Sequence, residues 1–446
     1  MSVTPFDSAI YRGLLSDDEL ARLFSDDAEL RGLLDVEAAL ARAEGQAGVI
    51  PRDAAATIDA AARALTVKPA DLAGGTTGAG VPVMALVAQL RKAAGEAGPH
   101  VHWGATSQDI VDTALVLRLK AACHILQSRL AQLANILAAQ AAAHCGTVMA
   151  GRTRFQQAVP TTYGLKAAGW LSMLVRHQAR LTELQSRLFV VQFGGAAGTL
   201  ASLGADGVAV AEAFAKELNL AAPASPWHTQ RDSVAEFAGW LSLVSGSLGK
   251  IGRDVLLMAQ SEVGEARPAA GGGSSTMPQK ANPIAAEMLV ALAQANAGQL
   301  ATMHAALGQE HERGGSGWTL EWLSLPQMVL ATGAGLAHAI VLIDGLVIDA
   351  ARMRATIEAT DGLMLAEAAT FALARHMPRP EAERLVSAAC KAVAQDRTHL
   401  CDVLKTLTDA PLDYAALRDP RNYLGSADAF VERVLAEAKR AFPNIR

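Results

Sequence analysis

The chain has 446 residues, of which 51% are hydrophobic and only 4% aromatic, and its formal net charge is −5 at pH 7. A core rich in Ala and Leu favours packed helices over sheets, because strands prefer β-branched and aromatic residues. Nucleic-acid binding requires a concentrated positive surface, which this sequence lacks. The four cysteines form no CxxC pair and the N-terminus has no signal-peptide pattern, so we expect reduced thiols in a cytoplasmic protein.

Short helices are predicted for residues 1–104, which we expect to form an N-terminal helical domain. Pro51 and Pro69 interrupt the apolar pattern, and so does the glycine-rich stretch GGTTGAGVP at residues 74–82. Because proline and glycine end or weaken helices, each uninterrupted segment in this region is short.

Five long helices are predicted within residues 105–351. From residue 108 to about 145, apolar residues recur every three or four positions between Leu115 and Leu137, which is typical of an amphipathic helix. Similar patterns cover about 162–188, 232–262, the segment after Pro283, and 320–346. We expect an elongated central bundle whose remaining apolar faces are buried against other subunits. Residues 352–446 return to short helices and are predicted to form a small C-terminal domain.

The most apolar stretch of the chain, residues 333–350, is predicted to be a buried helix of this bundle. His338, Asp344 and Asp349 interrupt it. A membrane span needs about 20 predominantly apolar residues, so we expect no membrane partner.

Polar segments interrupt the apolar pattern between the long helices. Four are dense in hydrogen-bonding side chains, HWGATSQD (102–109), GRTRFQQAVPTT (151–162), WHTQRD (227–232) and GGGSSTMPQKANP (271–283), and a weaker one is QEHERGGSGW (309–318). Most lie at predicted helix ends, where free N–H groups and the helix dipole favour anions. Their Thr, Ser, Gln, Arg, Lys and Asn side chains suit carboxylate ligands.

Each segment taken alone has a structural explanation as well. GATSQD fits a helix N-cap, GRTR a solvated turn, WHTQRD a helix start with a packed Trp, and the Gly-Ser segment a linker. His102, His228 and His311 could each contact substrate or be packed, hydrogen-bonded histidines.

Several nucleotide, metal and hydrolase motifs are absent from the sequence. The segment before Lys280 does not fit a P-loop, because no Gly precedes the lysine and Ala281 follows it. There is no HExxH and no GxSxG. We therefore expect no metal site, no P-loop nucleotide site and no hydrolase nucleophile of this kind.

In combination and in this order, the polar segments resemble the shared regions of the fumarase/aspartase superfamily. GGSSTMPQKANP is similar to its signature loop, and GATSQD and GRTRFQQAVPTT are similar to its other two regions. The resemblance implies an all-α fold of three helical domains. It also implies a homotetramer with a twenty-helix core, no cofactor, and active sites built from three subunits.

The resemblance also implies roles for individual residues. Ser274 corresponds to the acid/base serine on a loop that closes over the substrate, and the neighbouring Ser275 stays an alternative. Lys280 and Asn282 correspond to carboxylate binders, with Lys280 among the catalytic candidates. The other substrate-binding candidates are Thr106, Ser107, Arg152, Thr153, Arg154, Gln156, His228, Gln230 and Arg313.

Within the superfamily, several stretches resemble the 3-carboxymuconate cycloisomerases of protocatechuate breakdown, including HWGATSQD, VVQFGGAAGTLASLG, PWHTQRD and GSLGKIGRD. This resemblance implies the lactonisation of a small polycarboxylate. Arg154 stands where fumarases and adenylosuccinate lyases have a histidine that serves the leaving group. A carboxylate leaves without a proton, so this change fits lactone chemistry. The alternatives are an amine lyase of the adenylosuccinate or argininosuccinate type, and a homologue that keeps the fold without activity.

Overall fold

The protein is described by a computed structural model that covers residues 4–269, 272–273, 277 and 280–445. Contacts divide the chain into two compact units. Unit 1 comprises residues 1–129, 177–246 and 291–336, and unit 2 comprises residues 130–176, 247–290 and 337–446. The predicted division at residues 104/105 and 351/352 stays a prediction.

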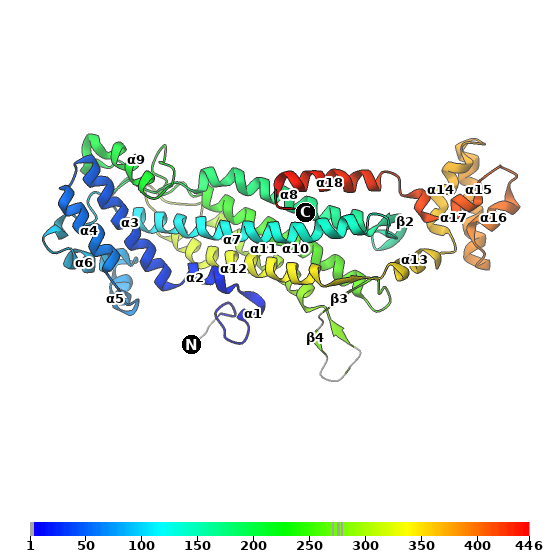
Figure 1. The fold of residues 1–446 in the computed structure, drawn as a ribbon, viewed down its shortest axis with the longest axis horizontal. Helices are drawn as coiled ribbons and strands as arrows, with labels where there is room; N and C mark the ends of the chain where they lie inside the picture. Colours follow the sequence, from blue (N-terminus) through cyan, green and yellow to red (C-terminus); the bar gives the residue numbers. More distant parts are fainter. Residues whose placement is uncertain (1–3, 270–271, 274–276, 278–279, 446) are drawn as a thin grey trace. The chain divides into compact units, whose positions relative to one another are not determined.

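The five predicted long helices are present (Figure 1). Each of them contributes residues to both units. They are α7 (Ser107–Ala143), α8 (Tyr163–Leu188), α10 (Asp232–Ala259), α11 (Ile284–Ala305) and α12 (Ser316–Asp344). Their leucine and alanine spacing places apolar side chains on one stripe, and the stripe is buried from Leu115 to Leu137 of α7.

Unit 1 also contains the shorter helices α1 (Arg12–Leu15), α2 (Asp18–Leu23), α3 (Asp26–Ala47), α4 (Arg52–Ala64), α5 (Ala70–Ala79), α6 (Val83–Ala93) and α9 (Gly207–Glu217), with 3₁₀ turns at Gly95–His100 and Ala201–Asp206. Of these, α3, α4, α5, α6 and α9 contribute to a core of mainly Leu, Val and Ala side chains. The side chain of Ser25 caps α3 by accepting the Ala28 N–H, and Gly48 ends the helix in the left-handed conformation. α3 packs against α4 and α9.

The shorter helices of unit 2 follow the long helices in the chain. They are α13 (Ala350–Glu358), α14 (Ala366–Leu373), α15 (Arg379–Asp396), α16 (Leu400–Leu407), α17 (Tyr414–Arg418) and α18 (Ala427–Ala441), with 3₁₀ turns at Leu363–Leu365 and Pro420–Tyr423. Helices α14, α15 and α16 enclose a small apolar core of their own.

Three antiparallel strand pairs occur among the described residues of unit 2, and none was predicted from the sequence. They pair β1 (Val148–Thr153) with β2 (Gln156–Thr162), β3 (Ala266–Pro268) with β6 (Leu346–Ile348), and β4 (Gly272–Gly273) with β5 (Ala281–Asn282). Two of these pairs involve the polar segments 151–162 and 271–283, for which the sequence predicts no strand. The fold is otherwise helical, as predicted.

By length and composition alone, the helix α12 is long and apolar enough to cross a membrane, with a mean hydropathy of 1.6 over its most apolar window. However, 61% of that window is buried inside the protein. The helix α12 ends at Asp344, and Leu346–Ile348 form the strand β6, which pairs with β3. The prediction of one buried helix over residues 333–350 is therefore only partly correct.

Candidate active site

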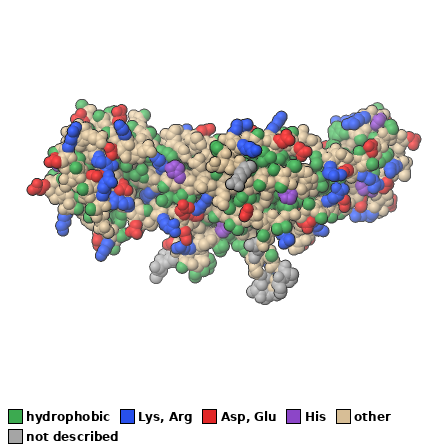
Figure 2. Space-filling view, in the orientation of Figure 1, with side chains coloured by type: hydrophobic (Ala, Val, Ile, Leu, Met, Phe, Trp, Pro, Cys, Tyr) green, Lys and Arg blue, Asp and Glu red, His purple; other side chains and the backbone are tan. Residues whose placement is uncertain are grey.

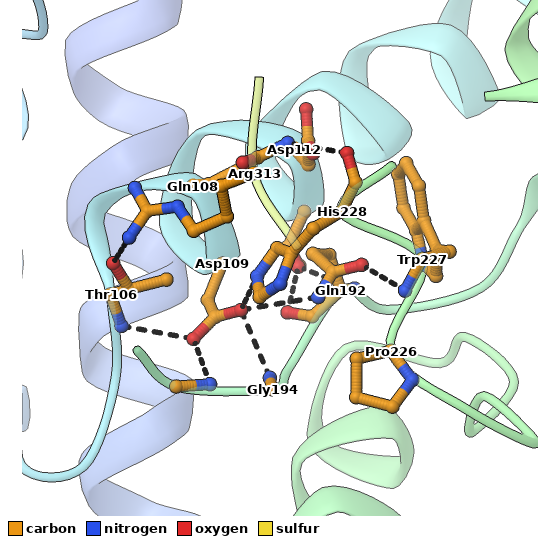
Figure 3. Close-up of polar contacts among 12 residues, drawn as sticks. Thr106, Gln108, Asp109, Asp112, Gln192, Gly194, Pro226, Trp227, His228 and Arg313 are labelled. Carbon is orange, nitrogen blue, oxygen red and sulfur yellow. Dashed lines mark hydrogen bonds and ion pairs between the residues drawn. The ribbon is translucent and has the colours of Figure 1, made fainter. Parts of the chain in front are cut away.

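The buried carboxylate of Asp109 organises the first turn of α7. Asp109 is fully buried and accepts hydrogen bonds from the backbone N–H groups of Thr106 (2.9 Å), Gly194 (3.0 Å) and Gly195 (2.9 Å), from Gln192 Nε2 (3.2 Å) and from His228 Nε2 (2.7 Å). Figure 3 shows these contacts converging on the carboxylate. A carboxylate only accepts hydrogen bonds, so Nε2 of His228 carries the proton that faces it. One side chain thereby joins two of the polar segments, 102–109 and 227–232, to the backbone at residues 192–195.

The segment PWHTQRD is held in place by further buried hydrogen bonds. The Trp227 backbone N–H donates to Gln192 Oε1 (2.7 Å), and the indole Nε1 donates to the Val191 carbonyl (3.0 Å). His228 is only 3% exposed, whereas Gln230 is exposed and donates to the Pro226 carbonyl at 3.4 Å. Nε2 of His228 is therefore hydrogen-bonded to Asp109, whereas the Gln230 side chain is accessible.

Arg231, near the end of this segment, lies between two buried acids. Its guanidinium donates to both oxygens of Asp112 (2.6 and 3.0 Å) and to both oxygens of Glu321 (2.8 and 2.6 Å), and it lies over the Trp227 ring. Burial lowers the pKa of Arg231, but the two carboxylates outweigh burial and raise it. The hydrogen-bond donors of Arg231 are therefore used by the protein itself.

Arg313 and Thr106, two predicted substrate binders, meet at the N-terminus of α7. Arg313 Nη1 donates to Thr106 Oγ1 (2.6 Å), although the residues are 207 positions apart in sequence (Figure 3). Arg313 is exposed, and Ser107 begins the helix beside it. A cation, a hydroxyl group and the positive end of a long helix together form an anion-binding arrangement.

A second group of predicted residues lies on the β1–β2 hairpin of unit 2. Arg152 forms a two-pronged ion pair with the fully buried Glu265, at 2.8 and 2.7 Å. A cavity of about 510 Å³ is lined in part by Arg152, Phe155, Gln156 and Glu262. The role of Arg152 in substrate binding stays a prediction, and the structure shows that its charge is matched by an acid.

The tip of this hairpin has an unusual backbone. Thr153 pairs with Gln156, so Arg154 and Phe155 form a two-residue turn. Their φ angles are +49° and +66°. Two positive φ angles characterise a type I′ turn, which favours Asn-Gly. For residues with a Cβ, the left-handed conformation costs about 1–2 kcal/mol each.

The third group lies on the strands β4 and β5. Gly272 pairs with Asn282 and Gly273 pairs with Ala281, while Lys280 is exposed and donates its backbone N–H to the Met277 carbonyl. Ser274 and Ser275 lie outside the described residues.

The substrate-binding candidates were predicted from the sequence, but the residues that hold them in place were not. The role of Asp109 is weakly indicated by the sequence, because this residue lies three positions after Thr106 at a helix start, as in a capping box. No sequence pattern indicates the role of Glu265, the partner of Arg152. Within the part of the chain that the structure describes, no group of three or more His, Cys, Asp or Glu side chains is placed to hold a metal ion.

Known families match most of the chain. A family described as "Lyase" matches residues 15–298, and one described as "Adenylosuccinate lyase C-terminus" matches residues 362–434. The chain belongs to this lyase family of the fumarase/aspartase superfamily. The resemblance seen in the sequence is therefore confirmed.

Individual relatives are similar to this superfamily member over nearly its whole length. A 3-carboxy-cis,cis-muconate cycloisomerase of Pseudomonas aeruginosa is 49% identical over 93% of both chains. One of Bradyrhizobium diazoefficiens is 44% identical over 97% of this chain and 99% of the relative. The crystal structure of the 3-carboxy-cis,cis-muconate lactonizing enzyme from Pseudomonas putida matches with a TM-score of 0.91 and 42% identity, covering 97% of this chain and 100% of that one.

Proposed function

We propose that the chain catalyses the cycloisomerisation of 3-carboxy-cis,cis-muconate to a carboxymuconolactone. The observation that carries this proposal is the 49% identity, over 93% of both chains, to a cycloisomerase of that name. The same comparisons support this activity over that of the amine lyase considered from the sequence. The proposed pathway is protocatechuate breakdown, and the proposed location is the cytoplasm.

The chemistry of the substrate fits the charges of the candidate residues. The muconate carries three carboxylates, while the protein carries a net charge of −5, so binding requires local cations. The exposed guanidinium of Arg313, next to the Thr106 hydroxyl and the N-terminus of α7, supports binding of one carboxylate. We assign Lys280, Asn282 and Arg154 to the same task from their positions in the superfamily motifs.

In the proposed reaction, one carboxylate oxygen attacks an alkene carbon and forms the lactone C–O bond. The alkene electron pair moves toward another carboxylate, and Ser274 (or its neighbour Ser275) then gives a proton to the carbon between them. Donors fixed where this negative charge develops would stabilise the intermediate. In reverse, the leaving group is a carboxylate with a pKa of about 4, which needs no proton. This accounts for Arg154 in place of a histidine.

The proposed assembly is a homotetramer with a twenty-helix core and active sites shared between subunits. Support comes from large apolar side chains that one chain leaves on the surface of its long helices (Figure 2). Leu243 of α10 is 52% exposed, and Leu323 and Val341 of α12 are 60% and 65% exposed. Exposed apolar side chains on several long helices are typical of subunit interfaces.

The proposal is tested by following the ultraviolet absorbance of 3-carboxy-cis,cis-muconate with purified protein, a chelator and no added cofactor. Lactonisation removes the conjugated diene, so the absorbance should fall with the wild type. With Ser274→Ala it should stay constant, while size-exclusion chromatography shows an unchanged assembly. A constant absorbance with correctly assembled wild-type protein would refute this substrate.

A further inference from the structure

The turn formed by Arg154 and Phe155 has a conformation that its residues do not favour. Both φ angles are positive, at +49° and +66°, in a two-residue loop closed by the pairing of Thr153 with Gln156. Asn-Gly would adopt this turn with little strain, whereas Arg and Phe carry a Cβ that crowds the backbone. Strained residues persist when something else requires their side chains, and they concentrate at functional sites.

The two side chains contribute little to the stability of their own chain. Phe155 is 84% exposed, more than any other large hydrophobic side chain among the described residues. The guanidinium of Arg154 makes no hydrogen bond or ion pair with any residue that the structure describes. An aromatic ring and a cation are therefore displayed together on a strained turn with no packing benefit to the fold.

The surroundings of the turn indicate what these side chains would contact. Phe155 and Gln156 line the cavity of about 510 Å³, which is large enough for a small polycarboxylate. The charge of Arg152 in its wall is cancelled by Glu265, and Glu262 adds a negative charge. A polycarboxylate would therefore need a further cation at this cavity, and Arg154 is the neighbour of Phe155.

We infer that Arg154 and Phe155 are specificity-determining residues, held on the strained turn to receive a flat, conjugated polycarboxylate. The guanidinium binds a carboxylate and the phenyl ring packs on the planar hydrocarbon. This inference rests on the proposed function, because muconate combines these two features in one molecule.

The central experiment replaces the turn with its preferred residues, in the variant Arg154→Asn/Phe155→Gly. This change removes both side chains while favouring the same backbone conformation. We expect the melting temperature to rise and the KM for 3-carboxy-cis,cis-muconate to increase at least about tenfold, since a charge-assisted contact of the usual strength is lost. The single variants Arg154→Gln and Phe155→Leu should each raise KM by part of that amount, with little change in kcat.

A matched control is provided by Arg397, which also has a positive φ (+57°) and an exposed side chain, at the end of α15. Arg397→Gly relieves the same kind of strain away from the hairpin, so its kinetic constants should equal those of the wild type. Substrate binding is also measured without turnover, as the substrate-induced rise in melting temperature on a Ser274→Ala background. That rise in melting temperature should disappear when Arg154→Asn/Phe155→Gly is combined with Ser274→Ala.

The outcomes separate the two proposals. If the wild type neither converts the muconate nor is stabilised by it, the proposed function fails and this inference fails with it. If the wild type is active and the Asn-Gly variant keeps KM and substrate stabilisation unchanged, only the inference is overturned. If the Asn-Gly variant is destabilised, the two single variants decide, and an unchanged KM in both contradicts the inference.

Discussion

Most charged side chains near the candidate site bind other parts of the protein. Asp109 receives five hydrogen-bond donors, Arg231 is enclosed by two acids, and Arg152 is paired with Glu265. Such pairs fix loop positions in a low-dielectric interior, and removing one partner leaves a buried charge uncompensated. Arg313, Arg154 and Lys280 remain exposed and are therefore the stronger candidates for ligand contact.

Glu44 of α3 is a buried acid of a different kind. It is 1% exposed, and neither of its carboxylate oxygens has a hydrogen-bond partner among the described residues. Burial, with a smaller effect from Glu37, raises the pKa of Glu44 to about 9. The folded protein therefore keeps this side chain neutral, while the unfolded chain ionises it above pH 4.5.

The protein should consequently lose stability as the pH rises. The folded-state pKa of Glu44 is the higher one, so its contribution to stability is fully present below the unfolded pKa and is lost progressively up to the folded pKa. Glu44→Gln resembles the neutral acid and should remove this loss, up to about 4 kcal/mol between pH 5 and pH 8. Melting temperatures at both pH values, at fixed protein concentration, test this. An equal pH dependence in wild type and variant would contradict it.

At the level of elements, the long helices could be predicted and the hairpin could not. Leucine and alanine at helical spacing specify α7, α8, α10, α11 and α12 without reference to the rest of the chain. The β1–β2 pair lacks both signals of a hairpin, since its strands do not alternate and its turn is Arg-Phe instead of Asn-Gly. Its formation depends on tertiary contacts such as the packing of α13 on β1, which local sequence does not encode.

Two adjacent glycines of α5 allow a test of how closely this helix packs on α6. A Cβ added at Gly75 would lie 2.7 Å from the Ala85 Cβ, whereas one added at Gly74 would meet nothing within 4 Å. Gly74→Ala should therefore stabilise the protein by about 1 kcal/mol through helix propensity. Gly75→Ala should lose that gain and destabilise the protein, because two rigid backbones must separate.

The free energy of unfolding of the two variants is compared by urea denaturation at fixed protein concentration. The wild type is the common reference, and the two substitutions are chemically identical and one residue apart. If Gly75→Ala proved as stable as Gly74→Ala, α5 would not be held against α6 at this point.

At the level of the whole molecule, sequence analysis identified the family but not the arrangement of the site. The order of the polar segments was sufficient for the superfamily, because its signature loop is long and specific. The structure places the candidates in three groups, at Thr106 and Arg313, on the β1–β2 hairpin, and on β5. Contacts between distant segments and between subunits decide which of these groups share an active site. No local sequence pattern specifies such contacts.

The proposed tetramer makes a prediction for the exposed apolar residues of α12. Replacing Leu323 or Val341 by Asp places a charge where a subunit interface is proposed, and burying an unpaired charge costs several kcal/mol. Each variant should therefore elute as a smaller species in size-exclusion chromatography with light scattering, and should lose cycloisomerase activity because shared active sites come apart. Val208 of α9, which is 71% exposed, provides the control, and Val208→Asp should remain tetrameric and active. Wild-type assembly in both α12 variants would place the interface elsewhere, whereas smaller species with full activity would show that each chain carries a complete active site.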